Sequence, residues 1–169
     1  MAGIKLGNRV LAVGMRDPGL IAAIAVKAGL TGRACAYDSD PARVRSAAAA
    51  IEREGALAEA VHAPWGALPY EAGSFDVAVA RDVLMTLTPD ERAGCLAEVR
   101  RVLRHGGRIL VIETARRRGL GALMGRTAVN AEYVSSGGAL AALQAAGFAG
   151  ARILAERDGV LYAEAAQRG

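Results

Sequence analysis

The residues with the clearest chemical meaning form a turn close to the amino terminus. The apolar segment 9–13 predicts a buried strand, and residues 14–19 (Gly-Met-Arg-Asp-Pro-Gly) lead from it into a helical segment. A strand, a glycine turn and a helix N-terminus are the usual cradle for an adenosine cofactor, because glycine lets backbone N–H groups approach the ligand. This turn contains Gly14 but places Arg16 and Pro18 where such a cradle usually has no side chain. Cofactor binding at this turn is therefore the main functional question.

The composition predicts one compact domain over residues 1–169. The chain is 53% hydrophobic and 22% charged, which supplies enough apolar surface for one core. No apolar run approaches the roughly 20 residues that a membrane span needs, and residues 1–7 lack the charged and apolar blocks of a secretory signal. We therefore expect a soluble, cytoplasmic protein with no membrane partner.

The cysteine and arginine patterns disfavour further function classes. Cys35 and Cys95 have neither metal-ligand spacing nor a disulfide framework, so we expect two small buried side chains and no metal site. The net charge is only +4, and the arginine run Arg116, Arg117 and Arg118 is more typical of a solvated segment than of a nucleic-acid surface. We therefore expect no nucleic-acid partner. A nicotinamide oxidoreductase is disfavoured because the G-x-G-x-x-G turn is missing.

Strand-like and helix-like segments alternate along most of the chain, which indicates parallel strands joined by crossover helices. The pattern changes near the carboxyl terminus, where Asp158 and Gly159 separate two apolar runs after a last helix. An Asp-Gly pair between apolar runs signals an antiparallel hairpin. The expected strands are residues 9–13, 33–37, 57–61, 75–80, 107–113, 151–156 and 160–165, and the expected helices are residues 19–28, 41–54, 89–103 and 137–146.

Four sequence strings carry a family resemblance. They are residues 68–77 (LPYEAGSFDV), 83–87 (VLMTL), 101–108 (RVLRHGGR) and 143–148 (LQAAGF). These strings resemble the segments around the fourth and fifth strands, and before the final hairpin, of the class I S-adenosylmethionine-dependent methyltransferases. The resemblance extends over residues 8–165 and is nearest in pattern to small-molecule enzymes of quinone biosynthesis. It implies an α/β fold with a doubly wound, mostly parallel seven-stranded sheet, an antiparallel C-terminal hairpin, helices on both faces, and S-adenosylmethionine as cofactor.

The resemblance assigns Asp38 to the cofactor. In this family, a carboxylate that ends the second strand usually holds the ribose hydroxyls, since an ionised carboxylate can accept from two adjacent hydroxyls. Asp38 ends the expected second strand. The alternative is that it caps the helix that starts at Pro41, although Asp40 could equally be that N-cap. If Asp38 is a ligand, its removal should weaken cofactor binding and change the stability of the free protein little.

Three family positions in and before the turn are altered. Ala12 replaces the acidic residue usually found in the first strand, and Arg16 and Pro18 replace glycines. In an alternative alignment one residue is inserted and Gly19 supplies the last glycine, which makes the loop longer but leaves it open. Arg16 either binds the carboxylate of the cofactor or fills its space. Asp17 is the expected N-cap and Pro18 the expected first helical residue, so the helix dipole still points at the turn.

Further candidate residues follow the third and fourth strands. The resemblance implies that His62 accepts from the adenine amino group, with Ala63 beside it and Trp65 over the base. The alternatives are a surface histidine and a tryptophan packed under the loop. Arg81 and Asp82 point toward the family's active-site mouth, where Arg81 would contact the cofactor and Asp82 would be a general base. Helix capping would explain Asp82 equally well.

Residues 114–134 are the material available to cover the site. In many relatives, helices before the first strand cover the cofactor, whereas this chain begins almost on that strand. We expect residues 114–134 to form either a small lid, with Tyr133 or Arg126 touching substrate, or an ordered loop. A second subunit could also close the site, which would make a homodimer functionally relevant.

The sequence leaves two function classes open. The first is an S-adenosylmethionine-dependent methyltransferase of a small molecule, because the whole-chain resemblance and Asp38 agree. The second is a protein of the same fold that has lost methyl transfer and acts as a binding or regulatory partner. The altered positions support the second class: Ala12, Arg16, Pro18 and His62. Methyl transfer needs the nucleophile, methyl carbon and sulfur held in line with water excluded, so no catalytic triad or metal is required.

Overall fold

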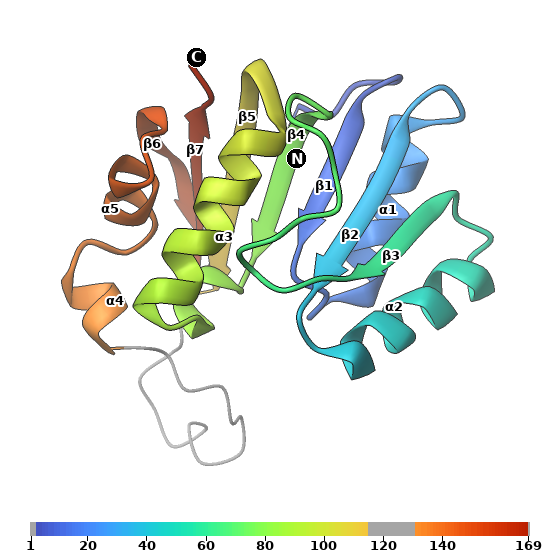
Figure 1. The fold of residues 1–169 in the computed structure, drawn as a ribbon, viewed down its shortest axis with the longest axis horizontal. Helices are drawn as coiled ribbons and strands as arrows, with labels where there is room; N and C mark the ends of the chain where they lie inside the picture. The colour runs from blue at the N-terminus through green and yellow to red at the C-terminus, as the bar shows by residue number, and fades with distance from the viewer. Residues whose placement is uncertain (1–2, 115–130, 169) are drawn as a thin grey trace.

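The core of the protein is one sheet of seven strands in the order β3-β2-β1-β4-β5-β7-β6 (Figure 1). The computed structural model describes residues 3–114 and 131–168. Strands β1 to β5 pair in parallel, whereas β7 pairs antiparallel with both β5 and β6. The expected doubly wound sheet with an antiparallel C-terminal hairpin is therefore confirmed. The strands are β1 (Arg9–Val13), β2 (Arg33–Asp38), β3 (Ala58–His62), β4 (Phe75–Arg81), β5 (Leu103–Thr114), β6 (Ala149–Arg157) and β7 (Val160–Ala166).

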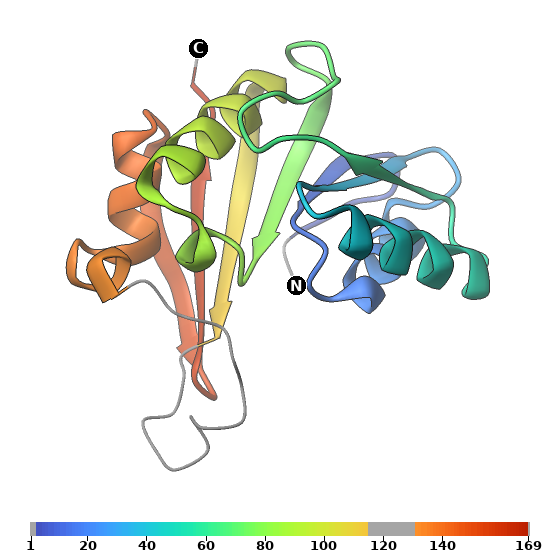
Figure 2. The same cartoon turned by 60° about the horizontal axis from the view of Figure 1, so that its bottom comes forward.

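Helices cover both faces of this sheet, because its strands are apolar on both sides. Along β1, Val10 and Ala12 pack with α1 and α2, whereas Leu11 and Val13 face the core that contains α3 and α5. Figure 2 shows α1 and α2 beside β1 to β3, and α3 and α5 beside the other half of the sheet. The helices are α1 (Pro18–Ala28), α2 (Pro41–Arg53), η1 (Leu84–Thr86), α3 (Pro89–Val102), α4 (Ala131–Ser135) and α5 (Gly138–Ala145).

Local sequence signals explain where these elements begin. Helices α1, α2 and α3 each have proline in their first turn, where the missing N–H has no intrahelical partner to lose. Asp40 caps α2 by accepting the backbone N–H of Ala42 at 2.8 Å. In the hairpin between β6 and β7, Asp158 and Gly159 have φ values of 54° and 74°. Positive φ at both central residues is the geometry of the favoured two-residue hairpin turn.

The start of β5 differs from the sequence prediction. The strand begins at Leu103, directly after α3, instead of at residue 107. Phe75 pairs with Leu103, and Val77 pairs with Arg108. Between these two pairs the chain advances two residues along β4 but five residues along β5. The extra residues bulge out of the ladder, and a local bulge has no periodicity that a pattern could report.

Two of the strings that carry the family resemblance contact each other at this bulge. The Arg101 guanidinium donates to the carbonyl oxygens of Tyr70 and Leu68 at 2.8 and 3.2 Å, and Arg104 pairs with Asp76 at 2.5 Å. These contacts fix the approach to β4 against the approach to β5. The strings are therefore signatures of the fold, and they lie away from the carboxyl ends of the strands.

Among residues 3–114 and 131–168, no helix has both the length and the apolar character needed to cross a membrane. Cys35 and Cys95 are both buried and unbridged, as the sequence predicts.

Candidate cofactor site

The residues singled out in the sequence gather at the carboxyl ends of the parallel strands. Gly14 follows β1, Asp38 ends β2, His62 ends β3, and Arg81 ends β4. The strand order reverses at β1, since β2 lies on one side of it and β4 on the other. In open α/β sheets this switch point is where ligands bind. Parallel pairing therefore brings residues from distant parts of the sequence to one edge.

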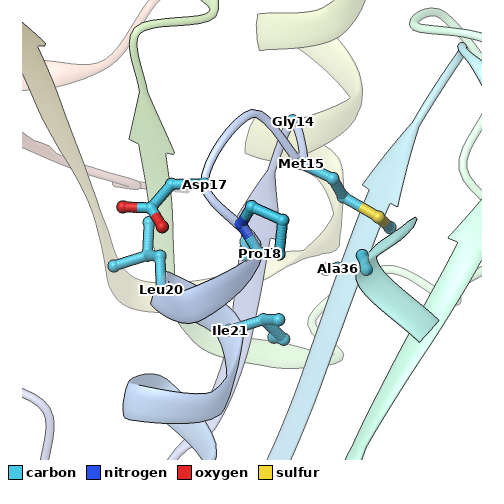
Figure 3. Close-up of a pocket in the computed structure, with 9 residues that line it drawn as sticks. Gly14, Met15, Asp17, Pro18, Leu20, Ile21 and Ala36 are labelled. Atoms are coloured by element: carbon cyan, nitrogen blue, oxygen red, sulfur yellow. The ribbon is translucent and has the colours of Figure 1, made fainter. Parts of the chain in front are cut away.

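The glycine turn has a geometry that only glycine accommodates. Gly14 has a φ of 80°, in the left-handed region, and its N–H donates to the Tyr37 carbonyl oxygen at 2.9 Å. A Cβ atom at Gly14 would lie 3.0 Å from two side-chain atoms of Val83. Figure 3 shows the Met15 side chain extending from this turn toward Ala36 on β2. Gly14 thus lets the backbone pass between β2 and the segment after β4.

Asp38 is held by the protein's own backbone. Its side chain is fully buried, with 0% of its surface exposed. One carboxylate oxygen accepts the Met15 N–H at 2.9 Å, and the other accepts the Asp40 N–H at 2.9 Å. The Arg43 guanidinium lies 3.5 Å from the second oxygen. In this conformation the carboxylate fastens the glycine turn to the end of β2, and no part of it faces solvent. The helix cap of α2 is Asp40, not Asp38.

Arg16 has an unused hydrogen-bond donor in the same place. Its Nε atom is buried and has no partner, whereas the side chain as a whole is half-buried. Burial lowers the pKa of Arg16, the nearby Arg43 charge lowers it further, and the Asp38 and Asp82 carboxylates oppose both effects. An unsatisfied buried N–H costs about 1–3 kcal/mol. The site therefore contains a cation that an incoming anion would stabilise.

Asp17 and Arg81 join the start of α1 to the end of β4. Their side chains form an ion pair of 2.8 Å. Asp17 occupies the N-cap position before Pro18, as the sequence predicts, but its side chain makes no capping hydrogen bond. The Arg81 pairing explains why, since the carboxylate turns toward the guanidinium instead of the first helical turn.

Asp82 links the ends of β4 and β5. It has a φ of 52°, which is uncommon for a residue with a side chain. Its carboxylate oxygens accept the Thr114 backbone N–H at 2.6 Å and the Thr114 hydroxyl at 3.1 Å. The helix-cap alternative is wrong, because Val83 precedes η1 and makes no side-chain cap. Asp82 holds together the two strand ends that border the site.

The residues after β3 divide into an exposed and a buried group. His62 is exposed, and its Nε2 lies 3.1 Å from the Ser39 carbonyl oxygen. Because a carbonyl can only accept, Nε2 carries the proton, and in the neutral ring Nδ1 is then an acceptor. The Ala63 N–H donates to the Asp38 carbonyl oxygen at 3.2 Å. Trp65 is buried against the Tyr37 ring, with the ring centroids 5.4 Å apart, so it packs in the core.

A buried pair that the sequence analysis missed lies beside Asp82. Glu113, near the end of β5, is only 9% exposed and accepts the Tyr133 hydroxyl at 2.6 Å. Burial raises the pKa of Glu113, the Tyr133 hydrogen bond opposes this rise, and the Asp82 charge adds to it. The Arg92 guanidinium lies 4.3 Å from the Tyr133 ring centroid. The available signal was an acidic residue at the carboxyl end of a buried strand, the same signal that identified Asp38.

The remaining expectations for the cover of the site fall on residues 115–130. Arg126 and the run Arg116 to Arg118 lie outside the described residues. Tyr133 is described, and its hydroxyl contacts Glu113 from α4.

Comparisons with known proteins relate this chain to methyltransferases. The family model for a methyltransferase domain matches residues 11–111. A curated relative, the ubiquinone/menaquinone biosynthesis C-methyltransferase UbiE of Cupriavidus taiwanensis, is 29% identical over 112 residues. That match covers 66% of this chain and 45% of the relative, so the chain spans less than half the length of that protein.

Solved structures show the same fold across nearly the whole chain. A SAM-dependent methyltransferase from Aquifex aeolicus has a TM-score of 0.79 at 19% identity, covering 98% of this chain and 85% of that one. The structure of PigF with SAH has a TM-score of 0.67 at 20% identity, covering 95% of this chain and 50% of that one.

Proposed function

Because this chain belongs to the class I S-adenosylmethionine-dependent methyltransferases, we propose that it binds S-adenosylmethionine and transfers its methyl group to a small molecule. The cofactor would lie at the carboxyl ends of β1, β2 and β4. One observation carries this proposal: the turn after Gly14 carries Arg16, whose Nε is buried without a partner and whose charge is stabilised by the Asp38 and Asp82 carboxylates. The small-molecule substrate is supported by the curated relative, which is a C-methyltransferase of ubiquinone and menaquinone biosynthesis.

The residues of the turn fit the methionine end of the cofactor. Gly14 lets the turn pass close to Val83 without a side chain, so the backbone keeps the conformation that would border the ligand. The cofactor's carboxylate would satisfy the Arg16 N–H in a charge-assisted hydrogen bond. When bound, the cofactor supplies an electrophilic methyl group on a sulfonium. The helix α1, whose N-terminus follows this turn, adds a favourable dipole for the same carboxylate.

Asp38 fits the ribose only after a local rearrangement. Its carboxylate is buried and already accepts two backbone N–H groups. For ribose hydroxyls to reach it, the Met15 N–H must move away or share its oxygen, and the side chains over the carboxylate must part. We infer that the turn opens on binding. His62 Nδ1 would then accept from the adenine amino group, and the backbone around Ala63 would border the base.

Asp82 is the proposed general base for a methyl-accepting substrate that must lose a proton. Its Oδ2 is the less firmly held oxygen, with a 3.1 Å bond to the Thr114 hydroxyl and Arg81 Nε at 3.8 Å. The other oxygen keeps the shorter bond to the Thr114 backbone. This division lets one oxygen take a proton while the other holds β4 against β5.

The test is direct binding of S-adenosylmethionine and of its demethylated product. Calorimetric titration should give one site per chain with a dissociation constant below about 100 μM. Product formation with a panel of phenols and quinols would then define the acceptor. Absence of heat with both ligands, in protein that melts cooperatively, would contradict the proposal.

A second candidate function is favoured by the complete burial of Asp38. A protein that keeps this fold but has lost methyl transfer would have no need of an exposed ribose acceptor. It would act as a binding or regulatory partner through its surface. The titration separates the two functions, because only the methyltransferase needs the turn to open for the cofactor.

A further inference from the structure

Helix α1 is apolar on all sides. Its sequence, PGLIAAIAVKA, contains one charged residue, Lys27. Ile21 and Ile24 are buried on the sheet side, whereas Ala23 and Val26 face away from it, and Val26 is 76% exposed. A surface helix normally carries polar residues on its outer side, and a helix that is apolar all round is normally buried all round. The outer side of α1 therefore has the composition of an interface.

Other exposed apolar side chains gather around the same helix. Among the described residues, seven large apolar side chains are exposed, and three of them lie on α1 or beside its end: Leu6, Val26 and Leu30. Leu6 lies over Gly29 at the end of α1, close enough that a Cβ atom there would be 2.7 Å from its Cδ2. We call the surface formed by Leu6, Gly19, Ala23, Val26 and Leu30 the α1 patch.

The α1 patch contains a hollow as well as protruding side chains. A groove runs between α1 and the end of α2, which lie against each other in Figures 1 and 2. Small residues of α1, among them Gly19 and Ala23, line it together with Val26. Its two charged lining residues have opposite signs, Lys27 from α1 and Glu54 after α2.

We propose that the α1 patch binds the α1 patch of a second copy of this chain in a two-fold symmetric dimer. A two-fold interface pairs one surface with itself, so the surface must carry both the protrusion and the hollow. Val26 is the protrusion, and the groove beside Gly19 and Ala23 is the hollow. The two charges complement each other across the axis, with Lys27 of each copy facing Glu54 of the other, and the exposed Arg53 that pairs with Glu54 at 3.5 Å within the chain would give way to Lys27. The lining is neutral in sum, which fits a second copy better than a highly charged partner.

Sedimentation equilibrium of the full chain tests this proposal. Between about 1 and 100 μM, the mean mass should rise from that of one chain toward that of two. Val26→Glu should weaken self-association at least tenfold, because it places a charge at the centre of the interface. Ile153→Glu is the matched control, since Ile153 is 47% exposed on β6 outside the α1 patch. It should leave the association unchanged. Circular dichroism and thermal unfolding establish that both variants fold.

Charge reversal tests the pairing across the axis. Lys27→Glu and Glu54→Lys should each dissociate the dimer, because each places two like charges against each other. An equimolar mixture of the two variants should dimerise again, since every contact then joins opposite charges. A wild-type chain that stays monomeric at about 100 μM would overturn the proposal. A dimer that Ile153→Glu disrupts and Val26→Glu does not, or variants whose mixture stays monomeric, would overturn it as well.

Discussion

The Asp38 carboxylate accepts the backbone N–H of Met15 at 2.9 Å, and this hydrogen bond joins the end of β2 to the glycine turn after β1. The same carboxylate accepts the Asp40 N–H at the start of α2. Asp38 therefore connects β2, the glycine turn and the start of α2. The turn cannot move without changing the hydrogen bonds of the Asp38 carboxylate. Cofactor binding and the local stability of the turn are coupled through this one side chain.

Asp38→Ala should lower both the stability of the free protein and its affinity for the cofactor. The buried Met15 N–H and the partly buried Asp40 N–H would lose a charged acceptor, which costs about 2–3 kcal/mol of unfolding free energy. Loss of the ribose contact should weaken cofactor binding by about 1.5–3 kcal/mol. Urea unfolding and calorimetric titration measure the two effects. This differs from the sequence-based expectation of little change in stability, because the Asp38 carboxylate is buried and accepts two backbone N–H groups.

Asp40→Ala is the matched control for this prediction. It removes the N-cap of α2, which should cost about 1 kcal/mol of stability, but leaves the Asp38 carboxylate in place. Cofactor affinity should stay within twofold of the wild type. Equal losses of affinity in the two variants would show that Asp38 acts only through the fold.

Asp82→Asn should separate the structural and catalytic contributions of this residue. The amide oxygen can still accept the Thr114 N–H, so the unfolding free energy should fall by no more than about 1.5 kcal/mol. Cofactor affinity should be nearly unchanged. Product formation should fall at least tenfold if Asp82 takes a proton from the acceptor, which corresponds to about 1.4 kcal/mol of barrier. Full activity in this variant would remove Asp82 from the chemistry.

Glu113 should make stability depend on pH. Burial raises its pKa in the folded state above the unfolded value of about 4.3. Between these two pKa values the folded protein binds more protons than the unfolded chain, so the free energy of unfolding falls as pH rises through that window. Glu113→Gln cannot ionise and escapes this loss. Its stability relative to the wild type should therefore increase as pH rises from about 4 through the raised folded-state pKa, and a constant difference in thermal unfolding would contradict this account.

The alternating pattern was sufficient to predict the fold. Buried strands and helix starts leave local signals, such as Pro41 at the start of α2 and the Asp158–Gly159 turn, and all seven strands were located from them. The beginning of β5 was missed because the bulge opposite Phe75 depends on contacts between Arg101 and a loop more than 30 residues earlier. Such a contact has no counterpart in a local pattern.

The place of the candidate site residues in the fold was predictable, but their burial and their hydrogen-bond partners were not. The end of a parallel strand identifies Asp38 as a member of the site, because all carboxyl ends meet at one edge. The burial of Asp38 depends on the direction of the Met15 N–H group, which cannot be predicted from the residue types alone. For the same reason, the Thr114 partner of Asp82 and the Tyr133 partner of Glu113 appear only when β4, β5 and α4 are packed together.

Calorimetric titration of S-adenosylmethionine into the wild type and into Arg16→Gly tests the central claim most directly. Arg16 carries the unpaired buried N–H at the turn, and a carboxylate that satisfies it should contribute about 1.5–3 kcal/mol. The wild type should bind, and Arg16→Gly should bind at least tenfold more weakly while unfolding at a similar temperature. Tighter binding by Arg16→Gly would show that the side chain fills the cofactor's space, and it would contradict the assignment of Arg16 as a ligand.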